Sequence, residues 1–360
     1  MLGGRYPPVF IFLKCGIITK DNNFEHVTGR LKFVRILSGI RPTGKVHVGH
    51  FVGVFENWLK LQDEGNDTFY FIADWHALTT HYEDTSELKE FTFDLMKTLI
   101  AVGLDKSTLF VQSAVKEHAE LMVLFSMITP LSWLERVPTY KEMRQQITNR
   151  DLSNAGFLMY PVLQAADILI YKADGVPVGE DQVYHVELTR EIARRFNYIF
   201  KREVFPEPKE LLSKVPKLLG TDGRKMSKSY GNTIPLITTE AELSKMVMPM
   251  VTDTNRKRRS DPGNPEVCPV WDYHKAFGTA DKPEEAQWVV EGCTQAKIGC
   301  IDCKKLLLKN MVQKLQPIWD RYNSITDAEV KEAMEEGNEK ARKVAQETME
   351  EVREAIKIMY

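Results

Sequence analysis

The sequence lacks the features that would place it in a membrane or a secretory pathway. It has no apolar run long enough to span a bilayer. The stretch before residue 33 has neither the small-residue cleavage site of a secretory signal nor the Arg- and Ser-rich composition of a transit peptide. We therefore expect a cytoplasmic protein with no membrane partner, in which residues 1–32 form an N-terminal extension.

An excess of charge of either sign is also missing. The chain has 48 Lys and Arg residues against 50 Asp and Glu residues, a formal net charge of −2. This balance excludes a globally basic nucleic-acid-binding protein, although it permits a local basic patch. With 360 residues, 43% of them hydrophobic, the chain is long enough for two domains with a sizeable core.

Cysteine is scarce, yet its distribution is uneven. Four of the five cysteines are Cys268, Cys293, Cys300 and Cys303, with the spacing C-x24-C-x6-C-x2-C. Buried cysteines are often ordinary small hydrophobes, but this crowding favours a metal site in a reduced compartment. A tetrahedral zinc ion and a [4Fe–4S] cluster both take thiolate ligands, so ligand type alone leaves the two open.

The spacing of apolar residues predicts the fold class. Apolar runs typical of strands alternate with stretches of helical spacing, and the strands are expected at 33–38, 68–73 and 108–112. This order is typical of an α/β fold with a Rossmann-type, doubly wound parallel sheet, which binds ligands at the carboxyl ends of its strands. Residues 176–182 are expected to form a turn that opens a helix through Asn197.

The composition changes to helical patterns after a Lys/Ser-rich loop near residue 225, and the last helix is expected at 327–360. We therefore predict a catalytic domain at 33–234 and an all-helical domain at 235–360, whose last helix could pack back on the first domain.

Two short stretches suggest phosphate chemistry. Pro42–His50 reads Pro-Thr-Gly-Lys-Val-His-Val-Gly-His, and residues 225–229 read Lys-Met-Ser-Lys-Ser. A histidine pair is more often structural, and a Lys/Ser cluster is more often a solvated loop. Together, however, they can donate hydrogen bonds and positive charge to phosphate oxygens. In this order they resemble the HIGH and KMSKS signatures of class I aminoacyl-tRNA synthetases.

One carboxylate, Asp167, lies inside the apolar stretch 156–171. A buried carboxylate needs a partner, and for most such residues an internal Arg or backbone amides provide it. A substrate donor is the alternative, because an indole offers one N–H and no acceptor. A site built on that bond can reject analogues without the donor by roughly 10⁴–10⁵.

The segments 37–44, 160–167 and 176–190 resemble the bacterial tryptophanyl-tRNA synthetase family, and the likeness runs from about residue 35 to the end. The resemblance implies ATP-dependent activation of L-tryptophan with Mg²⁺, followed by transfer to tRNA(Trp), in a homodimer. A subset of this family carries a [4Fe–4S] cluster on similarly spaced cysteines, which favours the cluster over structural Zn²⁺.

The resemblance also assigns roles by position. The catalytic residues would be His47, His50, Lys225 and Lys228. The ATP-binding residues would be Arg41, Thr43, Gly49, His50, Gly179, Asp181, Lys225, Met226, Ser227 and Lys228. The tryptophan-binding residues would be Leu37, His76, Tyr160, Gln164, Asp167, Val176, Val178 and Gln182. The cluster ligands would be Cys268, Cys293, Cys300 and Cys303.

Two rival functions remain open, and so does the dimer interface. A tyrosyl-tRNA synthetase would share the fold and both signatures, but would place polar partners for a phenol at the base of its pocket. A non-catalytic, synthetase-like RNA-binding protein would not need both the histidine pair and the lysine pair. Residues 103–136, with apolar runs at 121–127 and 131–134, are the candidate interface, although core packing explains these runs equally well.

Overall fold

The structure is a computed structural model that describes residues 34–137, 154–179, 182–212, 218–226 and 230–358. Five parallel strands form one sheet, in the order β3-β2-β1-β4-β5. They are β1 (Arg35–Ile40), β2 (Asp67–Ile72), β3 (Thr108–Val111), β4 (Gly175–Val178) and β5 (Lys209–Leu212). This is the doubly wound order. Successive strands are added on one side from β1 to β3 and on the other side from β4 to β5, which leaves a crevice between β1 and β4.

The first three strands confirm the sequence prediction within two residues, but β4 corrects it. Residues 176–178 were expected in a turn and instead form a strand that pairs along its whole length with β5. On the other side, β4 pairs with β1 only at Gly175 and Ile36. Pro177 has no N–H to donate to a ladder, so the two strands separate beyond this point. The crevice therefore opens between Leu37–Gly39 and Val176–Val178.

Helices pack on both faces of the sheet. They are α1 (Val48–His50), a π-helix η1 (Phe51–Phe55), α2 (Glu56–Asp63), α3 (Asp74–His81), α4 (Leu88–Val102), a short 3-10 turn η2 (Gln112–Ala114), α5 (Glu117–Ile128), α6 (Leu131–Glu135), α8 (Ala155–Ile170) and α9 (Val183–Phe200). Alternate side chains of a strand enter opposite cores. Ile36 and Tyr70 belong to one core, and Leu37 and Phe69 belong to the other.

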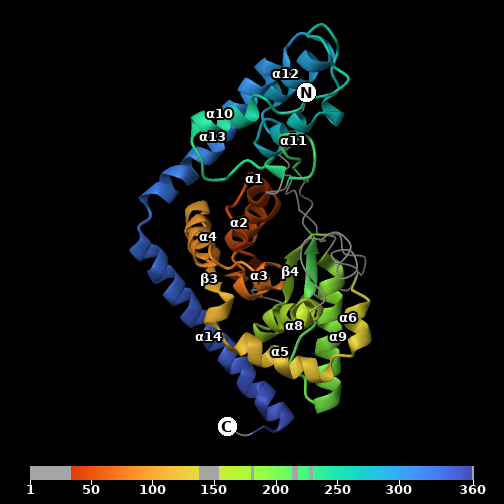
Figure 1. Ribbon diagram of the computed structural model, residues 1–360, viewed down its shortest axis with the longest axis vertical. Helices are drawn as coiled ribbons and strands as arrows, with labels where there is room; N and C mark the ends of the chain where they lie inside the picture. Colours follow the sequence, from red (N-terminus) through yellow and green to blue (C-terminus); the bar gives the residue numbers. More distant parts are fainter. Residues whose placement is uncertain (1–33, 138–153, 180–181, 213–217, 227–229, 359–360) are drawn as a thin grey trace, which may run out of the picture. The chain divides into compact units, whose positions relative to one another are not determined.

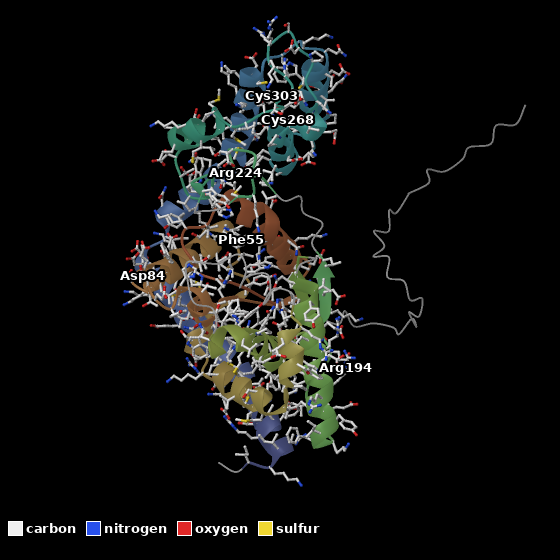
Figure 2. The ribbon with its side chains drawn as sticks, turned by 45° about the vertical axis from the view of Figure 1, so that its right-hand side comes forward. Phe55, Asp84, Arg194, Arg224, Cys268 and Cys303 are labelled. Atoms are coloured by element: carbon white, nitrogen blue, oxygen red, sulfur yellow. The ribbon has the colours of Figure 1, made fainter. Side chains whose placement is uncertain are left out.

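From Glu240 onward the described chain is helical, as the sequence predicts. The elements are α10 (Glu240–Val247), a 3-10 turn η5 (Pro265–Val267), α11 (Pro269–Ala276), α12 (Pro283–Thr294), α13 (Cys300–Ser324) and α14 (Asp327–Ile356). Cys268 and Cys303 both lie in this helical part (Figure 2). None of the helices among the described residues is long and apolar enough to cross a membrane.

The last helix returns to the sheet. A capping box of Thr326 and Glu329 starts α14, which then runs beside β3 and α5 (Figure 1). Because β3 is an edge strand, its outer N–H groups need partners. Asn338 supplies one, since its Oδ1 accepts from the backbone N–H of Val111 at 2.8 Å. Gly337 allows this approach, because a Cβ there would lie 1.7 Å from the carbonyl oxygen of Leu109.

The close approach of Gly337 to β3 predicts an unusual effect of replacing this glycine by alanine. Replacing Gly by Ala inside a helix normally stabilises a protein by up to about 1 kcal/mol. We expect Gly337→Ala to lower the free energy of unfolding by about 1–3 kcal/mol instead, because α14 must move off β3. Urea unfolding measures the change. The matched control is Gly53→Ala, since a Cβ at Gly53 has no atom within 4 Å. Equal effects of the two substitutions would contradict the close contact.

Candidate active site

The histidine pair lies directly after β1, at the carboxyl end of the sheet. The rings of His47 and His50 are stacked, with their centroids 3.7 Å apart. The backbone N–H of His47 donates to Nδ1 of His50 at 3.3 Å. Gly49 lies between them, and a Cβ there would come within 2.9 Å of Nδ1 of His47 and 3.2 Å of Sδ of Met226. A residue of the Lys/Ser loop thus packs against the first signature.

Backbone pairing holds these two distant stretches of chain together. The N–H of Val48 donates to the carbonyl of Ile234 at 2.9 Å, and the N–H of Leu236 donates to the carbonyl of Val46 at 2.9 Å. Lys225 lies close to this pairing, because Nδ2 of Asn232, two residues before Ile234, donates to the carbonyl of Lys225 at 3.1 Å. The two signatures, about 175 residues apart in sequence, therefore meet at one edge of the sheet.

A buried amide closes the base of the Lys/Ser loop. Nδ2 of Asn232 donates to Oδ1 of Asp222 at 2.8 Å and to the carbonyl of Lys225 at 3.1 Å. Gly220 leaves room for this amide, because a Cβ there would lie 2.3 Å from Nδ2. The hydrogen bond from Asn232, together with the backbone N–H of Arg224, lowers the pKa of Asp222 to about 2. The contacts of Asn232 thus hold Asp222 and Lys225, at the start of the loop, in place.

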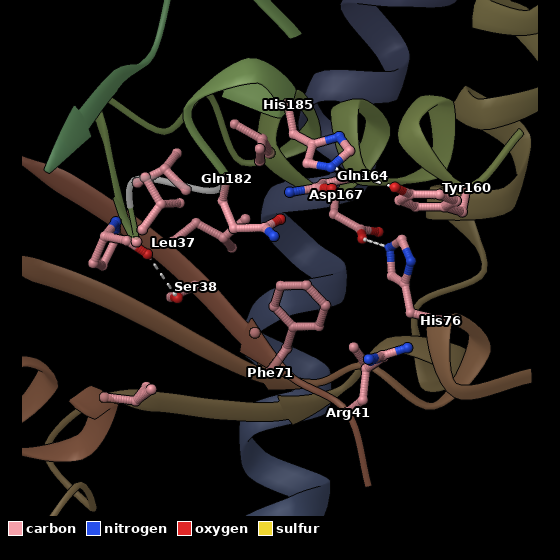
Figure 3. A pocket seen from close by; sticks show the side chains of 18 of the residues that line it. Leu37, Ser38, Arg41, Phe71, His76, Tyr160, Gln164, Asp167, Gln182 and His185 are labelled. Carbon is pink, nitrogen blue, oxygen red and sulfur yellow. Dashed lines mark hydrogen bonds and ion pairs between the residues drawn. The ribbon is translucent and has the colours of Figure 1, made fainter. Parts of the chain in front are cut away.

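A cavity of about 390 Å³ occupies the crevice between β1 and β4 (Figure 3), a volume within the usual range for small-ligand sites. All eight residues that the sequence assigned to tryptophan line it, namely Leu37, His76, Tyr160, Gln164, Asp167, Val176, Val178 and Gln182. The aliphatic side chains come from the separated strands, and most of the polar ones come from α3 and α8.

The buried Asp167 is held by three side chains. Its Oδ1 accepts from Nδ1 of His118 at 2.6 Å and from Nε2 of Gln112 at 2.8 Å. Its Oδ2 accepts from Nε2 of His76 at 2.8 Å (Figure 3) and again from Gln112 at 2.9 Å. Burial alone would raise the pKa of Asp167, but the hydrogen bonds from His118 and His76 and the electrostatic interaction with their rings lower it below the usual value. The carboxylate is therefore ionised at neutral pH.

Sequence analysis did not find Gln112 or His118. Gln112 directly follows β3, so its position on the same rim as Asp74 and His76 was an available signal. His118 belongs to α5 and is fully buried, packed against the rings of Phe71 and Phe110. Nothing in the spacing of α5 shows that this side chain meets a carboxylate of α8.

The residues predicted to bind ATP lie around the two signatures and the cavity. Arg41 and Gly179 line the cavity. Thr43 lines a neighbouring cavity of about 510 Å³ together with Gly44 and Lys45. Gly49, His50, Lys225 and Met226 lie where the signatures meet, as described above. Asp181, Ser227 and Lys228 fall outside the described residues.

The four clustered cysteines are free thiols, each partly buried. Nη1 of Arg256 lies 3.8 Å from Sγ of Cys293 and 3.9 Å from Sγ of Cys300. Burial and the other three thiols raise the pKa of Cys303 to about 12. Cys300 and Cys303 lie one turn apart at the start of α13, and Arg256 faces both Cys293 and Cys300. Even so, within the described ranges no three His, Cys, Asp or Glu side chains are arranged so that they could hold a metal ion.

Comparison with known proteins identifies the family. The family described as "tRNA synthetases class I (W and Y)" matches residues 30–316. A tryptophan–tRNA ligase of Thermotoga maritima is 65% identical over 331 residues, which cover 91% of this chain and all of that protein. A tryptophan–tRNA ligase of Aquifex aeolicus is 44% identical, and the match covers 90% of this chain and all of that protein.

Solved structures agree with the sequence comparison. Tryptophanyl-tRNA synthetase from Campylobacter jejuni, complexed with ADP and tryptophan, is 33% identical with a TM-score of 0.80, and the match covers 90% of this chain and all of that one. A tyrosyl-tRNA synthetase from Archaeoglobus fulgidus is 22% identical with a TM-score of 0.61, which shows a shared fold. The chain therefore belongs to the class I tRNA synthetases for tryptophan and tyrosine, and its function is that of a tryptophan–tRNA ligase.

Proposed function

We propose that L-tryptophan binds in the cavity between β1 and β4 with its indole N–H directed at Asp167. The observation that carries this proposal is the ionised, buried carboxylate of Asp167 on a cavity whose walls include Val176 and Val178. An indole presents apolar faces and one N–H donor, so it matches these walls and this acceptor. Tyr160 and Gln182, which also line the cavity, would hold the polar end of the amino acid.

Binding then requires an exchange of donors on Asp167. Four hydrogen-bond contacts already reach its two oxygens, and a carboxylate offers about four lone-pair sites. Of the three donors, only His76 is among the residues that line the cavity. The indole N–H would therefore replace Nε2 of His76 on Oδ2. His76, which the sequence resemblance assigns to tryptophan binding, could then turn toward the polar end of the amino acid.

We propose that the meeting point of the two signatures handles the phosphates of ATP. The carboxylate of tryptophan attacks the α-phosphorus, and pyrophosphate leaves. His47 and His50 would donate hydrogen bonds to phosphate oxygens, and Lys225 and Lys228 would stabilise the charge that spreads onto the leaving group. Mg²⁺ would share that charge. Arg41, Thr43, Gly49, Gly179, Asp181, Met226 and Ser227 are the remaining ATP contacts in this proposal.

The amino acid requirement of the first half-reaction tests the cavity assignment. We expect the purified protein with Mg²⁺ to exchange pyrophosphate into ATP when tryptophan is supplied, but not with tyrosine or phenylalanine. Asp167→Asn keeps the shape of the side chain and removes its charge, so it should raise the KM for tryptophan about tenfold or more. Circular dichroism checks that the variant folds. An unchanged KM would contradict the role of Asp167.

We propose that residues 33–234 form the catalytic domain and that residues 235–360 bind tRNA(Trp), with residues 1–32 as an extension. ATP, free amino acid and tRNA meet in the cytoplasm, where we expect the protein to act.

We also propose that Cys268, Cys293, Cys300 and Cys303 hold a [4Fe–4S] cluster. The donor set fits, because all four are free thiols, and three of them are brought together by Arg256 and the first turn of α13. The guanidinium of Arg256 faces two of them and would offset the negative charge of four thiolates. The alternative is a structural Zn²⁺ held by the same four thiolates. The cluster would order the tRNA-binding helices.

Metal analysis distinguishes these two readings. Protein purified without oxygen should be brown and contain iron and sulfide in equal amounts, and a chelator with oxygen should bleach it. The variant Cys300→Ser should be colourless, whereas the tryptophan-dependent exchange rate should stay within about twofold of the original, because none of the four cysteines is among the residues that line the cavity. Colourless protein with stoichiometric zinc would overturn the cluster assignment.

Finally, we propose that the enzyme is a homodimer that associates through α5 and α6. These helices use one face for the core, where Leu121, Phe125 and Leu134 are buried. Their other face is exposed, with exposed fractions of 53% for Val123, 75% for Met127 and 57% for Leu131. The sequence left core packing and a dimer interface as alternatives for the apolar runs of these helices. One side of the helices packs in the core, and we assign the other side to the interface.

Light scattering at micromolar concentration tests this interface. We expect the mass of a dimer for the unmodified chain and of a monomer for Met127→Glu, because a charge buried between two copies is costly. Trp288→Glu is the matched control, since Trp288 is an exposed apolar residue of α12. A monomer without any substitution, or a dimer that survives Met127→Glu, would contradict the proposal.

A further inference from the structure

A chain of buried hydrogen bonds continues behind Asp167, on the side away from the cavity. Nε2 of His118 lies 2.8 Å from the hydroxyl of Tyr171, and Nδ1 of His118 lies 2.6 Å from Oδ1 of Asp167. Tyr171 and His118 are fully buried, and Asp167 is 1% exposed. Neither Tyr171 nor His118 is among the residues that line the cavity. Their polar atoms therefore serve the carboxylate without contact with a ligand there.

The chemistry of the three groups determines which atom donates and which accepts in each of these hydrogen bonds. An ionised carboxylate can only accept, so Nδ1 of His118 carries the proton that faces Asp167. In a neutral imidazole the other nitrogen is an acceptor, and the only group facing it in the described contacts is the hydroxyl of Tyr171. The hydroxyl thus donates to Nε2. Burial and the nearby Asp167 charge raise the pKa of Tyr171 well above its ordinary value, which keeps that proton in place.

The tautomer of His118 decides what Asp167 presents to the cavity. With the proton on Nδ1, His118 donates to Oδ1, and together with Gln112 it holds the carboxylate plane while Oδ2 stays available to the cavity side. With the proton on Nε2, two lone pairs would face each other across 2.6 Å. That arrangement would push the carboxylate away or require a proton on Oδ1. A neutral carboxylic acid is a weaker acceptor than a carboxylate, so Oδ2 would then hold the indole N–H less strongly.

We propose that His118 and Tyr171 are positioning residues for tryptophan selectivity. Tyr171 fixes the tautomer of His118, and His118 fixes the ionised carboxylate of Asp167 in the orientation that receives the indole N–H. This inference rests on the proposed contact between the indole and Asp167. It predicts that a hydroxyl group with no access to the substrate affects discrimination at one atom of the substrate.

The test uses Tyr171→Phe, which removes the hydroxyl and little else. Titration calorimetry measures the Kd of tryptophan and of its benzothiophene analogue, in which sulfur replaces the indole N–H. We expect tryptophan to bind about three- to tenfold more weakly to the variant, the range for one lost hydrogen bond. The analogue has no N–H to offer, so its Kd should change by less than about twofold.

Tyr70→Phe is the matched control. Tyr70 is fully buried in β2 and donates its hydroxyl to the carbonyl of Trp58 at 3.0 Å, in the core on the other face of the sheet. It should destabilise the fold comparably and leave the Kd of both ligands unchanged.

A second test substitutes His118. The variant His118→Gln retains a side-chain donor and should lose less selectivity than His118→Leu.

Each outcome separates the two hypotheses. If Tyr171→Phe weakens both ligands equally, or neither, the positioning role is wrong while the indole contact stands. If the unmodified protein itself does not prefer tryptophan over the sulfur analogue, the proposed contact with Asp167 is wrong, and the positioning role with it.

Discussion

The burial of one ionised carboxylate constrains the whole catalytic part of the chain. An unpaired charge at the position of Asp167 would cost far more than the few kcal/mol by which a domain is stable. Its four hydrogen-bond contacts come from α3, from the turn after β3 and from α5. These elements must therefore approach α8 at defined positions, which also sets the floor of the cavity. In the binding mode that we propose, stability and substrate recognition thus depend on the same atoms.

A second constraint is the early separation of β1 and β4. The two strands pair only at Ile36 and Gly175, and the cavity lies where they part. The two signatures meet because the backbone at Val46–Val48 pairs with that at Ile234–Leu236. The sites that we propose for the amino acid and ATP thus adjoin, which the attack of a carboxylate on a phosphorus atom requires.

The sequence predicted the elements whose signal is local. Periodicity located the first three strands and the helical region after residue 235. The family resemblance identified eight residues that line one cavity. Sequence analysis failed at β4, because a strand of four residues with Pro177 in it reads as a turn. It also missed His118 and Tyr171, since hydrophobic spacing shows which face of a helix is buried but not which polar group it meets there. The spacing of the four cysteines indicated that they act together, but how their thiols are arranged depends on the packing of helices, which the spacing does not show.

The central claim is that Asp167 receives the indole N–H in place of His76. A crystal structure of the protein with tryptophan bound tests it directly. We predict that the indole nitrogen lies about 3 Å from Oδ2 of Asp167, that Nε2 of His76 has moved away from that oxygen, and that His118 and Gln112 keep their contacts. An indole nitrogen directed elsewhere, with His76 still bound to Asp167, would contradict the account.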